Sequence, residues 1–229
     1  MKISQNPQNT IEWHLDRAGM ITASDFCVLT KQPKTIKDKE NGVLTDLQKK
    51  YVIAKANDRL LLNAKKYIVP DQLDNPDIRR GNDHEKFART FYSAKKEHLV
   101  SEIGFCTSED CESFGCSPDG IFNYKNHFAI LEIKCPRVTG HYNTIKSQTI
   151  PNDYLLQIHA QLTVTDAVFC DYVSFCLDAQ EGHELYIQRV WNDKQINKDV
   201  LDIVHKFNDL IEKEIKEIKN IDAEKLWTT

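Results

Sequence analysis

Apolar residues recur at helical spacing in four parts of the chain. The segments are residues 43–67, 77–96, 152–163 and 193–219. Such spacing predicts amphipathic helices with one face buried. Pro70 ends the first pattern, and Pro76 is a favourable entry to the second. The second helix is expected to turn four residues toward a core: Ile78, Phe87, Ala88 and Phe91.

The middle of the chain changes to short apolar or alternating runs, which are typical of strands. Residues 100–106, 120–124 and 128–134 are predicted to be neighbouring strands of one sheet, and residues 167–177 and 184–190 add two more. Helices therefore precede a β-meander, which is followed by a helix, two strands and a last helix. This order predicts an α/β fold, with a mixed central β-sheet flanked by helices.

Polar segments complete the organisation of what we interpret as a single domain over residues 1–229. Residues 1–10 are predicted to be a loose tail, and residues 31–42, charged and ending in Gly42, a mobile surface loop. Between them, residues 22–25 (Thr-Ala-Ser-Asp) supply side chains of the kind that cap a short helix, and this turn is also a candidate anion site.

Composition narrows the class of protein. Hydrophobic residues make up 41% and charged residues 28%, which does not fit a disordered, fibrous or membrane protein. The first ten residues lack the apolar core of a signal peptide, so a cytoplasmic location is expected. The net charge of −4 argues against a uniformly basic DNA-coating protein, although a local basic groove stays compatible with it.

All seven cysteines are expected to be free thiols in such a compartment. Cys106, Cys111 and Cys116 recur every five residues, which raises a metal or iron–sulfur site as an alternative. The Cys-x-x-Cys spacing of zinc sites is absent, so buried thiols are the favoured interpretation.

The candidate chemistry lies in Ser117-Pro118-Asp119-Gly120 and, further along, in residues 131–136 (Leu-Glu-Ile-Lys-Cys-Pro). The turn places Asp119 at the start of a strand, while Glu132 and Lys134, two apart on an apolar strand, point to one face. Two carboxylates suit Mg²⁺ or Mn²⁺, and Lys134 would orient or deprotonate an attacking water, the latter provided that its pKa is lowered. The alternative is a turn aspartate beside an exposed Glu-x-Lys strand pair.

Three further blocks accompany this pattern in a fixed order. Trp13 to Ser24 forms the first, Gly81 to Thr90 the second, and Gln157 to Gln161 the third. Together with the Asp119 and Lys134 segments they resemble the phage lambda exonuclease family of recombination nucleases, in the restriction-endonuclease-like PD-(D/E)XK superfamily. The resemblance runs from residue 13 to about residue 161 and implies a restriction-endonuclease-like nuclease core.

The resemblance implies a role for each matching residue. Asp119, Glu132 and the Ile133 main-chain carbonyl would bind the metal, and Lys134 would be the catalytic lysine. Glu85 would be a further ligand or water-holder, and Gln157 would orient water or the lysine; the alternative for Gln157 is a solvent-facing amide.

A second set of matching residues implies a 5′-phosphate pocket made of Arg17, Ser24 and Ser117. A guanidinium and hydroxyls suit a terminal phosphate, although Arg17 by itself is equally typical of a surface residue. One position departs from the family: Arg137 follows Pro136 at once, whereas the family's further pocket arginine aligns near Gly140 or His141. Glu109 and Asp110 fall where the family carries another acid, but a solvated turn is the safer interpretation.

The activity that the resemblance implies is a Mg²⁺-dependent 5′-to-3′ exonuclease, with Mn²⁺ as a possible substitute. It would degrade one strand of linear double-stranded DNA with a 5′-phosphate end to mononucleotides, leaving 3′ overhangs for recombination by strand annealing. A homotrimer ring, a single-strand annealing protein as partner and a phage or prophage origin in a bacterial host are implied as well. The alternatives are an endonuclease or repair nuclease of the same fold, and a DNA-binding module with an inactive metal site.

Overall fold

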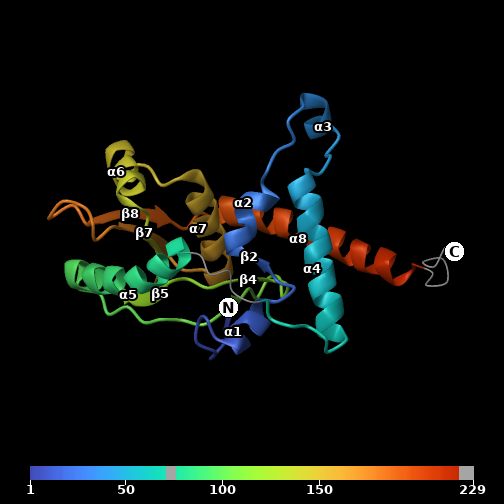
Figure 1. Cartoon of the computed structure of the whole chain (residues 1–229), viewed down its shortest axis with the longest axis horizontal. Coiled ribbons are helices and arrows are strands. Elements are labelled where there is room, and N and C mark those ends of the chain that lie inside the picture. Colours follow the sequence, from blue (N-terminus) through green and yellow to red (C-terminus); the bar gives the residue numbers. More distant parts are fainter. Residues whose placement is uncertain (71–75, 222–229) are drawn as a thin grey trace.

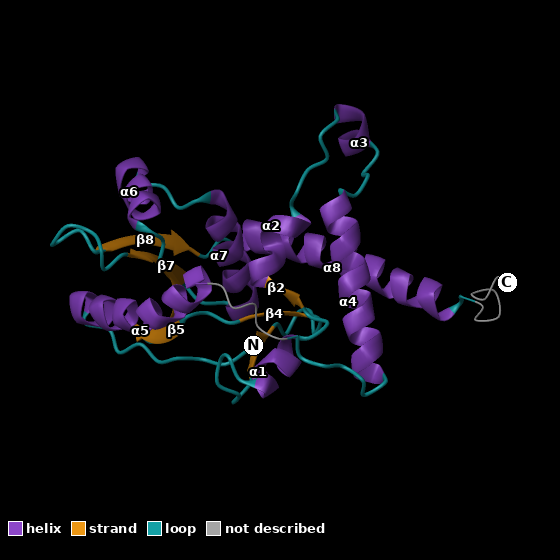
Figure 2. Ribbon diagram, viewed as in Figure 1, coloured by secondary structure: helices purple, strands orange, loops and turns teal. Residues whose placement is uncertain are grey.

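The structure, a computed structural model, describes residues 1–70 and 76–221, except for the side chains of residues 76–78 and 82. Its strands form two four-stranded sheets flanked by helices (Figure 2). The first sheet has the order β1 (Lys2–Ile3), β3 (Cys106–Thr107), β4 (Phe114–Cys116), β2 (Ile21–Thr22). The second has the order β5 (Gly120–Tyr124), β6 (His127–Lys134), β7 (Phe169–Phe175), β8 (Leu185–Trp191). In the second sheet β6 and β7 are parallel and the outer pairs antiparallel.

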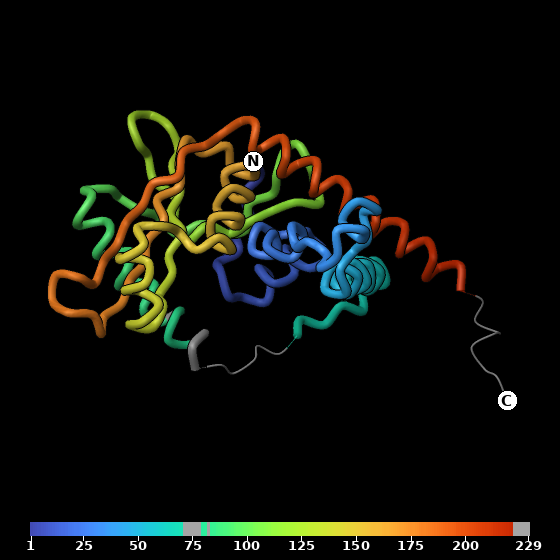
Figure 3. Tube along the Cα trace, turned by 90° about the horizontal axis from the view of Figure 1, so that it is seen from above, coloured from blue at the N-terminus to red at the C-terminus, as the bar shows by residue number. Residues whose placement is uncertain are grey.

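The helices cover these sheets and extend beyond them (Figure 1). Their bounds are α1 Ile11–Arg17, α2 Phe26–Leu29, α3 Ile36–Glu40, α4 Asp46–Asn63, α5 Pro76–Lys96, α6 Val138–Ser147, α7 Asn152–Thr165 and α8 Lys194–Lys219, with a 3₁₀ turn at Ala23–Asp25. Helix α8 packs against α4 and α7, while α5 and α6 lie at the other end of the molecule (Figures 1 and 3). Within the described residues, none of these helices combines the length and the apolarity needed to cross a bilayer.

The expected α/β class is confirmed, but the prediction of one sheet is wrong. Residues 100–106 contribute only Cys106 to a strand, which pairs with β1 and β4 rather than with β5. Ser101 keeps a single isolated bridge to Ile121, so the chain passes from one sheet to the other at this point. Helix α6 was not predicted, whereas the four expected helices are present within a few residues of their bounds.

The first ten residues are held in place, contrary to the prediction of a loose tail. Ile3 pairs with Cys106, and Asn6 Nδ2 donates to Asp16 Oδ2 at 2.9 Å. Gln8 Nε2 donates to the Pro118 carbonyl at 2.9 Å, next to Asp119. The segment therefore supports the turn that carries a candidate site residue.

Two other polar segments also differ in detail from the prediction. Residues 31–42 contain the short helix α3, capped by the Thr35 hydroxyl, and their mobility stays a prediction. In the 22–25 turn, the Thr22 hydroxyl donates to Asp25 Oδ2 at 2.8 Å, and neither side chain caps a helix N–H. The turn is therefore organised by side chains bonded to one another.

Helix α5 faces the second sheet with Ala88 and Tyr92, both fully buried. Phe87 and Phe91 are 55% and 46% exposed, so their predicted place in the core is wrong, and Ile78 lies outside the described side chains. The Tyr92 hydroxyl donates to buried Asp171 on β7 at 2.7 Å, and this bond fixes the rotation of α5. The Phe91 ring lies 5.3 Å from the ring of Phe175, measured between centroids.

Strand β6 is covered on both faces, as a central strand requires. Leu131 and Ile133 pack in the cluster that contains Ala88 and Tyr92 of α5. Ile130 packs in a separate cluster with residues of α7. Because side chains alternate along a strand, Glu132 and Lys134 share the α7 face with Ile130.

The close packing of the first sheet predicts a contrast between two glycine substitutions. A Cβ at Gly115 would lie 2.3 Å from the Phe105 ring and 2.6 Å from the Cys106 carbonyl oxygen, whereas a Cβ at Gly81 in α5 meets nothing within 4 Å. We expect Gly115→Ala to lower the free energy of unfolding by about 1–3 kcal/mol. Gly81→Ala, the matched control, should raise it by about 0.5–1 kcal/mol through helix propensity. Urea unfolding measures both, and equal effects would contradict the packing argument.

Candidate active site

Asp119 lies in the turn between the two sheets and is clamped to β6. Its main-chain N–H donates to the Leu131 carbonyl at 3.0 Å, and its Oδ2 accepts the Ile133 N–H at 2.6 Å. The next residue must be small, because a Cβ at Gly120 would lie 2.4 Å from Val100 Cγ1. The sequence therefore places one carboxylate against the strand that carries the second.

Glu132 is buried, with 1% of its surface exposed, and is surrounded by donors. Its Oε1 accepts from Lys134 Nζ at 2.5 Å and from Gln157 Nε2 at 2.7 Å. Its Oε2 accepts from Gln161 Nε2 at 2.6 Å. A buried carboxylate needs such partners, and here they fix its orientation. The structure thus brings together Glu132, Lys134 and Gln157, as expected, and adds Gln161.

Negative charge accumulates at this point. Burial, Glu132 and Glu85 together raise the pKa of Asp119 well above its usual range. Burial raises the pKa of Glu85 as well; Arg89 opposes this shift and Glu132 adds to it. The repulsion between Asp119 and Glu132, to which Glu85 adds, favours a bound cation.

Lys134 is held in its charged form. Burial alone would lower its pKa, but the carboxylates of Glu132 and Asp119 outweigh burial and raise it above the ordinary value. This shift favours a role for Lys134 in orienting the attacking water over a role in deprotonating it. Its ammonium group lies 5.1 Å from the centre of the Tyr154 ring, which adds a cation–π contact.

The donor set fits a hard divalent ion. Asp119, Glu132 and the Ile133 carbonyl offer oxygen ligands, which Mg²⁺ and Mn²⁺ prefer. Across residues 1–70 and 76–221, no three His, Cys, Asp or Glu side chains are close enough to form a metal site by themselves. The main-chain oxygen would have to complete the set, and the raised pKa values of Asp119 and Glu85 are the observation that supports the fit.

Glu85 approaches the site from α5 and is paired with Arg89, a residue whose role was not predicted. Arg89 Nη2 donates to Glu85 Oε1 at 2.5 Å, and its Nε donates to the Asp119 carbonyl at 2.9 Å. Arg89 follows Glu85 by four residues, the spacing at which helix side chains meet, and this is the signal that could have identified it.

Arg17, Ser24 and Ser117 meet in a pocket of about 140 Å³. Arg17 Nη1 donates to Ser117 Oγ at 3.2 Å, and its Nη2 donates to Ser24 Oγ at 3.4 Å. Trp13 forms a wall, because its ring lies 4.3 Å from the Arg17 guanidinium and its Nε1 donates to Ser117 Oγ at 3.0 Å. Burial lowers the pKa of Arg17, an effect that the carboxylate of Asp25 opposes. The three predicted pocket residues therefore lie together in one polar pocket.

The pocket and the acidic site share two glutamines. Gln157 and Gln161 line the pocket and also donate to Glu132. The other atom of the Gln161 amide, Oε1, is buried without a hydrogen-bond partner among the described residues. Gln161 follows Gln157 by four residues on α7, the spacing at which two helix side chains lie on the same face. This spacing is the sequence signal that could have identified Gln161.

The other charged candidate residues lie apart from this pocket, whereas Cys116 is one of its lining residues. Arg137 is exposed at the N-cap of α6 and is not among the residues that line the pocket. Glu109 pairs with the N-terminal amine at 3.1 Å and lies with Asp110 beside a different cavity. Cys106, Cys111 and Cys116 are buried free thiols.

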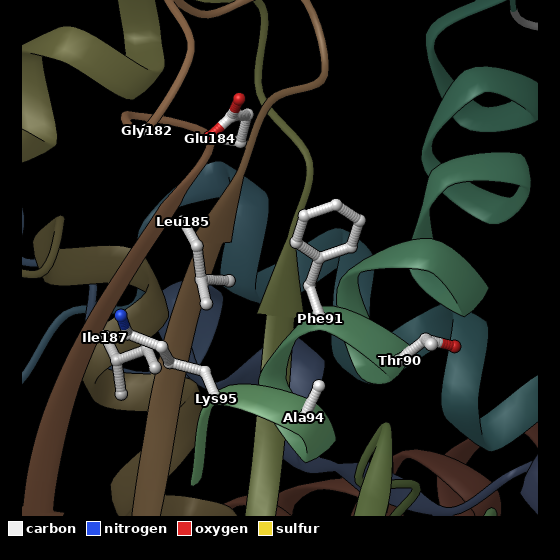
Figure 4. A pocket seen from close by; sticks show the side chains of 8 residues that line it. All are labelled: Thr90, Phe91, Ala94, Lys95, Gly182, Glu184, Leu185 and Ile187. Carbon is white, nitrogen blue, oxygen red and sulfur yellow. The ribbon is translucent and has the colours of Figure 1, made fainter.

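A larger cavity, of about 620 Å³, lies between α5 and β8 (Figure 4). Its walls include Phe91, Leu185 and Ile187, with Lys95 and Glu184 at its edge. The carboxylates that surround Lys134 are not among its lining residues. Size alone therefore does not identify a candidate site, and the side chains with candidate chemistry lie at the smaller pocket beside Glu132.

Comparison with known proteins identifies the family. Residues 12–168 match the YqaJ-like viral recombinase domain, a span that contains nearly all the residues of the candidate site. The chain belongs to this family. The expected resemblance to recombination nucleases is thereby confirmed at the level of the family.

Solved structures resemble this YqaJ-like chain over most of its length. The alkaline exonuclease LHK-Exo from Laribacter hongkongensis is 26% identical with a TM-score of 0.79, covering 95% of this chain and 100% of that one. The same enzyme in complex with dAMP gives a TM-score of 0.78. A phage-related exonuclease from Haemophilus somnus 129PT, 14% identical with a TM-score of 0.64, shares the fold. The restriction-endonuclease-like architecture is thus shown for the YqaJ-like chain.

A viral relative matches a shorter part. The uncharacterized protein R354 of Acanthamoeba polyphaga mimivirus is 27% identical over 126 residues, which cover 51% of the YqaJ-like chain and 23% of R354. The YqaJ-like chain thus matches less than a quarter of that relative's length. This match supports a relationship between the two proteins but no argument about activity.

Proposed function

We propose that this YqaJ-like protein is a metal-dependent exonuclease that degrades one strand of linear double-stranded DNA from a 5′-phosphate end. The family and the likeness to an alkaline exonuclease support a nuclease of phage-type recombination. The observation that carries the finer proposal is the sharing of Gln157 and Gln161 between Glu132 and the Arg17 pocket. A site for hydrolysis and a site for a terminal phosphate are thereby joined.

A bound Mg²⁺ or Mn²⁺ would polarise the phosphoryl oxygen and lower the pKa of an attacking water. Asp119, Glu132 and the Ile133 carbonyl would hold it. Lys134, kept charged by Glu132, would stabilise the negative charge that develops on the phosphorane and orient the water. Gln157 would fix the position of Glu132, and Glu85 would hold a water from the α5 side.

The Arg17 pocket would select the end of the DNA. Its guanidinium and the hydroxyls of Ser24 and Ser117 suit the oxygens of a terminal phosphate. Because this pocket adjoins the hydrolytic site through two neighbouring turns of α7, the bond that is cut would lie close to the bound end. Cleavage would then release short products, down to mononucleotides, and would leave a 3′ overhang on the complementary strand.

One assay tests both halves of the proposal. We expect end-labelled linear duplex with a 5′ phosphate to be converted to mononucleotides in Mg²⁺, and the same DNA with a 5′ hydroxyl to react at least about tenfold more slowly. EDTA should stop both reactions. A closed circular duplex is the control, and cleavage of the circle at a similar rate would indicate an endonuclease of the same fold instead.

The assembly that the resemblance implies remains part of the proposal. A homotrimer ring enclosing DNA and a single-strand annealing protein would give processive resection coupled to annealing. Sedimentation at micromolar concentration should give three times the monomer mass of 26.5 kDa. A monomer under these conditions would contradict the ring while leaving hydrolysis at a DNA end intact.

A further inference from the structure

A second pocket of about 390 Å³ lies beside Tyr154, a residue that contacts Lys134. Its lining residues come from the segment after β6, from α6, from the start of α7 and from β7: Pro136, Gly140, Thr144, Pro151, Asn152, Asp153, Tyr154 and Tyr172. None of these eight residues is basic, and one is acidic. The pocket is therefore poorly suited to a phosphate.

Helix α7 connects this pocket to the hydrolytic site. Tyr154 lines the pocket and its ring lies 5.1 Å from Lys134 Nζ. Gln157, on the next turn, and Gln161, one turn further, both donate to Glu132 and both line the Arg17 pocket. At about 1.5 Å per residue, the helix axis from Tyr154 to Gln161 spans about 10 Å. Along α7 the second pocket therefore comes before the turns that reach Glu132 and the Arg17 pocket.

The walls of the pocket suit a flat ring. Tyr154 stacks on Tyr172 with 6.1 Å between centroids and 24° between planes. Burial raises the pKa of Tyr172 to about 12, while hydrogen bonds to Ser174 and Thr144 favour the opposite shift. Tyr172 is fully buried and supports the ring of the more exposed Tyr154. Pro136 and Pro151 add apolar surface, and Asn152 and Asp153 form a polar rim.

Gly140 keeps the pocket open on the α6 side. A Cβ at this position would meet Pro136 Cβ at 3.1 Å, and no other atom within 4 Å. A larger side chain would therefore fill space between two lining residues. Since Gly140 is exposed, such a change leaves the buried core untouched.

We propose that this pocket, the base pocket, holds the nucleobase on the 3′ side of the scissile phosphate, the first nucleotide left on the shortened strand. The inference rests on the proposed function, because the terminal phosphate in the Arg17 pocket sets the direction of the strand past Lys134. The pocket offers the aromatic ring of Tyr154 but no set of donors and acceptors matched to one particular nucleobase. It therefore favours stacking, which every nucleobase supports. The base pocket would thus hold the strand in place without selecting its sequence.

The test uses duplex DNA with a 5′ phosphate and 2-aminopurine as the second nucleotide of that strand, bound in EDTA so that no cleavage occurs. We expect binding of the unmodified protein to quench this fluorophore, and Gly140→Val to remove the quench and weaken binding by about 5- to 30-fold. Tyr154→Leu should do the same, whereas Tyr154→Phe should retain the quench. Asn143→Val, at an exposed position of α6 outside the pocket, is the matched control.

Three results would overturn the base pocket. A quench that persists in both Gly140→Val and Tyr154→Leu would show that the base lies elsewhere, and so would equal quenching of 2-aminopurine at the second and tenth nucleotides. Failure of the proposed function is seen separately, as a lack of cleavage of linear duplex by the unmodified protein in Mg²⁺. Cleavage with no quench at the second nucleotide overturns only the base pocket.

Discussion

Asp119→Asn is expected to abolish nuclease activity and, at the same time, to raise the thermal stability of the metal-free protein. The asparagine oxygen still accepts the hydrogen bond that Ile133 N–H donates at 2.6 Å, so the turn keeps its geometry. The negative charge required by a divalent ion is lost. We expect the rate of hydrolysis in Mg²⁺ to fall on the order of 10³-fold.

The gain in stability follows from the sign of the pKa shift. Burial, Glu132 and Glu85 raise the folded-state pKa of Asp119 above its unfolded value. Its contribution to stability is therefore complete below the unfolded pKa and is lost as the pH rises through the folded value. At pH values above the folded-state pKa, removing the charge should raise the Tm in EDTA by on the order of 2–4 °C for each kcal/mol gained in the free energy of unfolding. In acid the substitution should have little effect on the Tm.

Calorimetry in EDTA across the pH range, paired with the end-labelled DNA assay, measures both effects on one variant. Asp110→Asn is the matched control, because Asp110 is exposed and lies away from β6. A variant that retained activity would remove Asp119 from the metal site. A lower Tm at neutral pH would show instead that the ionised carboxylate stabilises the turn.

Arg17→Met should erase the preference for a 5′ phosphate. Methionine keeps an apolar stem against the Trp13 ring, which lies 4.3 Å from the guanidinium, but it removes the donors to Ser24 and Ser117. Hydrogen bonds to charged groups contribute about 1.5–3 kcal/mol, so the 5′-phosphate substrate should lose roughly 10- to 150-fold in kcat/KM. The 5′-hydroxyl substrate should change little.

The ratio of the two rates, rather than either rate alone, measures this effect and cancels any general loss of folded protein. Arg17→Lys should restore only part of the preference, because an ammonium lacks the planar fork of a guanidinium. Lys146→Met, which removes an exposed cation of α6, is the control. An unchanged ratio in Arg17→Met would place the terminal phosphate in another part of the protein.

The proximity of Glu132 and Lys134 could be predicted because it depends on strand periodicity. Glu132 and Lys134 point to one face by alternation, and their contact at 2.5 Å agrees with that expectation. The pKa of Lys134 could not be predicted. This pKa depends on how deeply Lys134 is buried and on how close the carboxylates of Glu132 and Asp119 come to it.

The parts of the fold that were missed depend on partners far away in the sequence. Helix α6 contains Gly140 and several β-branched residues and has little intrinsic helix propensity. Buried His141 ties it to the Ser174 hydroxyl at 2.8 Å and to the His183 carbonyl at 2.7 Å. Strand β1 is two residues long and exists only through its pairing with β3. Neither feature leaves a periodic pattern in its own segment.

The clamp between Asp119 and Ile133 also has a consequence for the order of events during folding. Its partners are 14 positions apart, whereas Arg17 and Ser117 are 100 positions apart. Closing a short loop loses less chain entropy than closing a long one, so the β5–β6 hairpin can form before the N-terminal helix docks. A refolding chain would then bring its carboxylates together first and complete the phosphate pocket last, so metal affinity would precede the ability to select a DNA end.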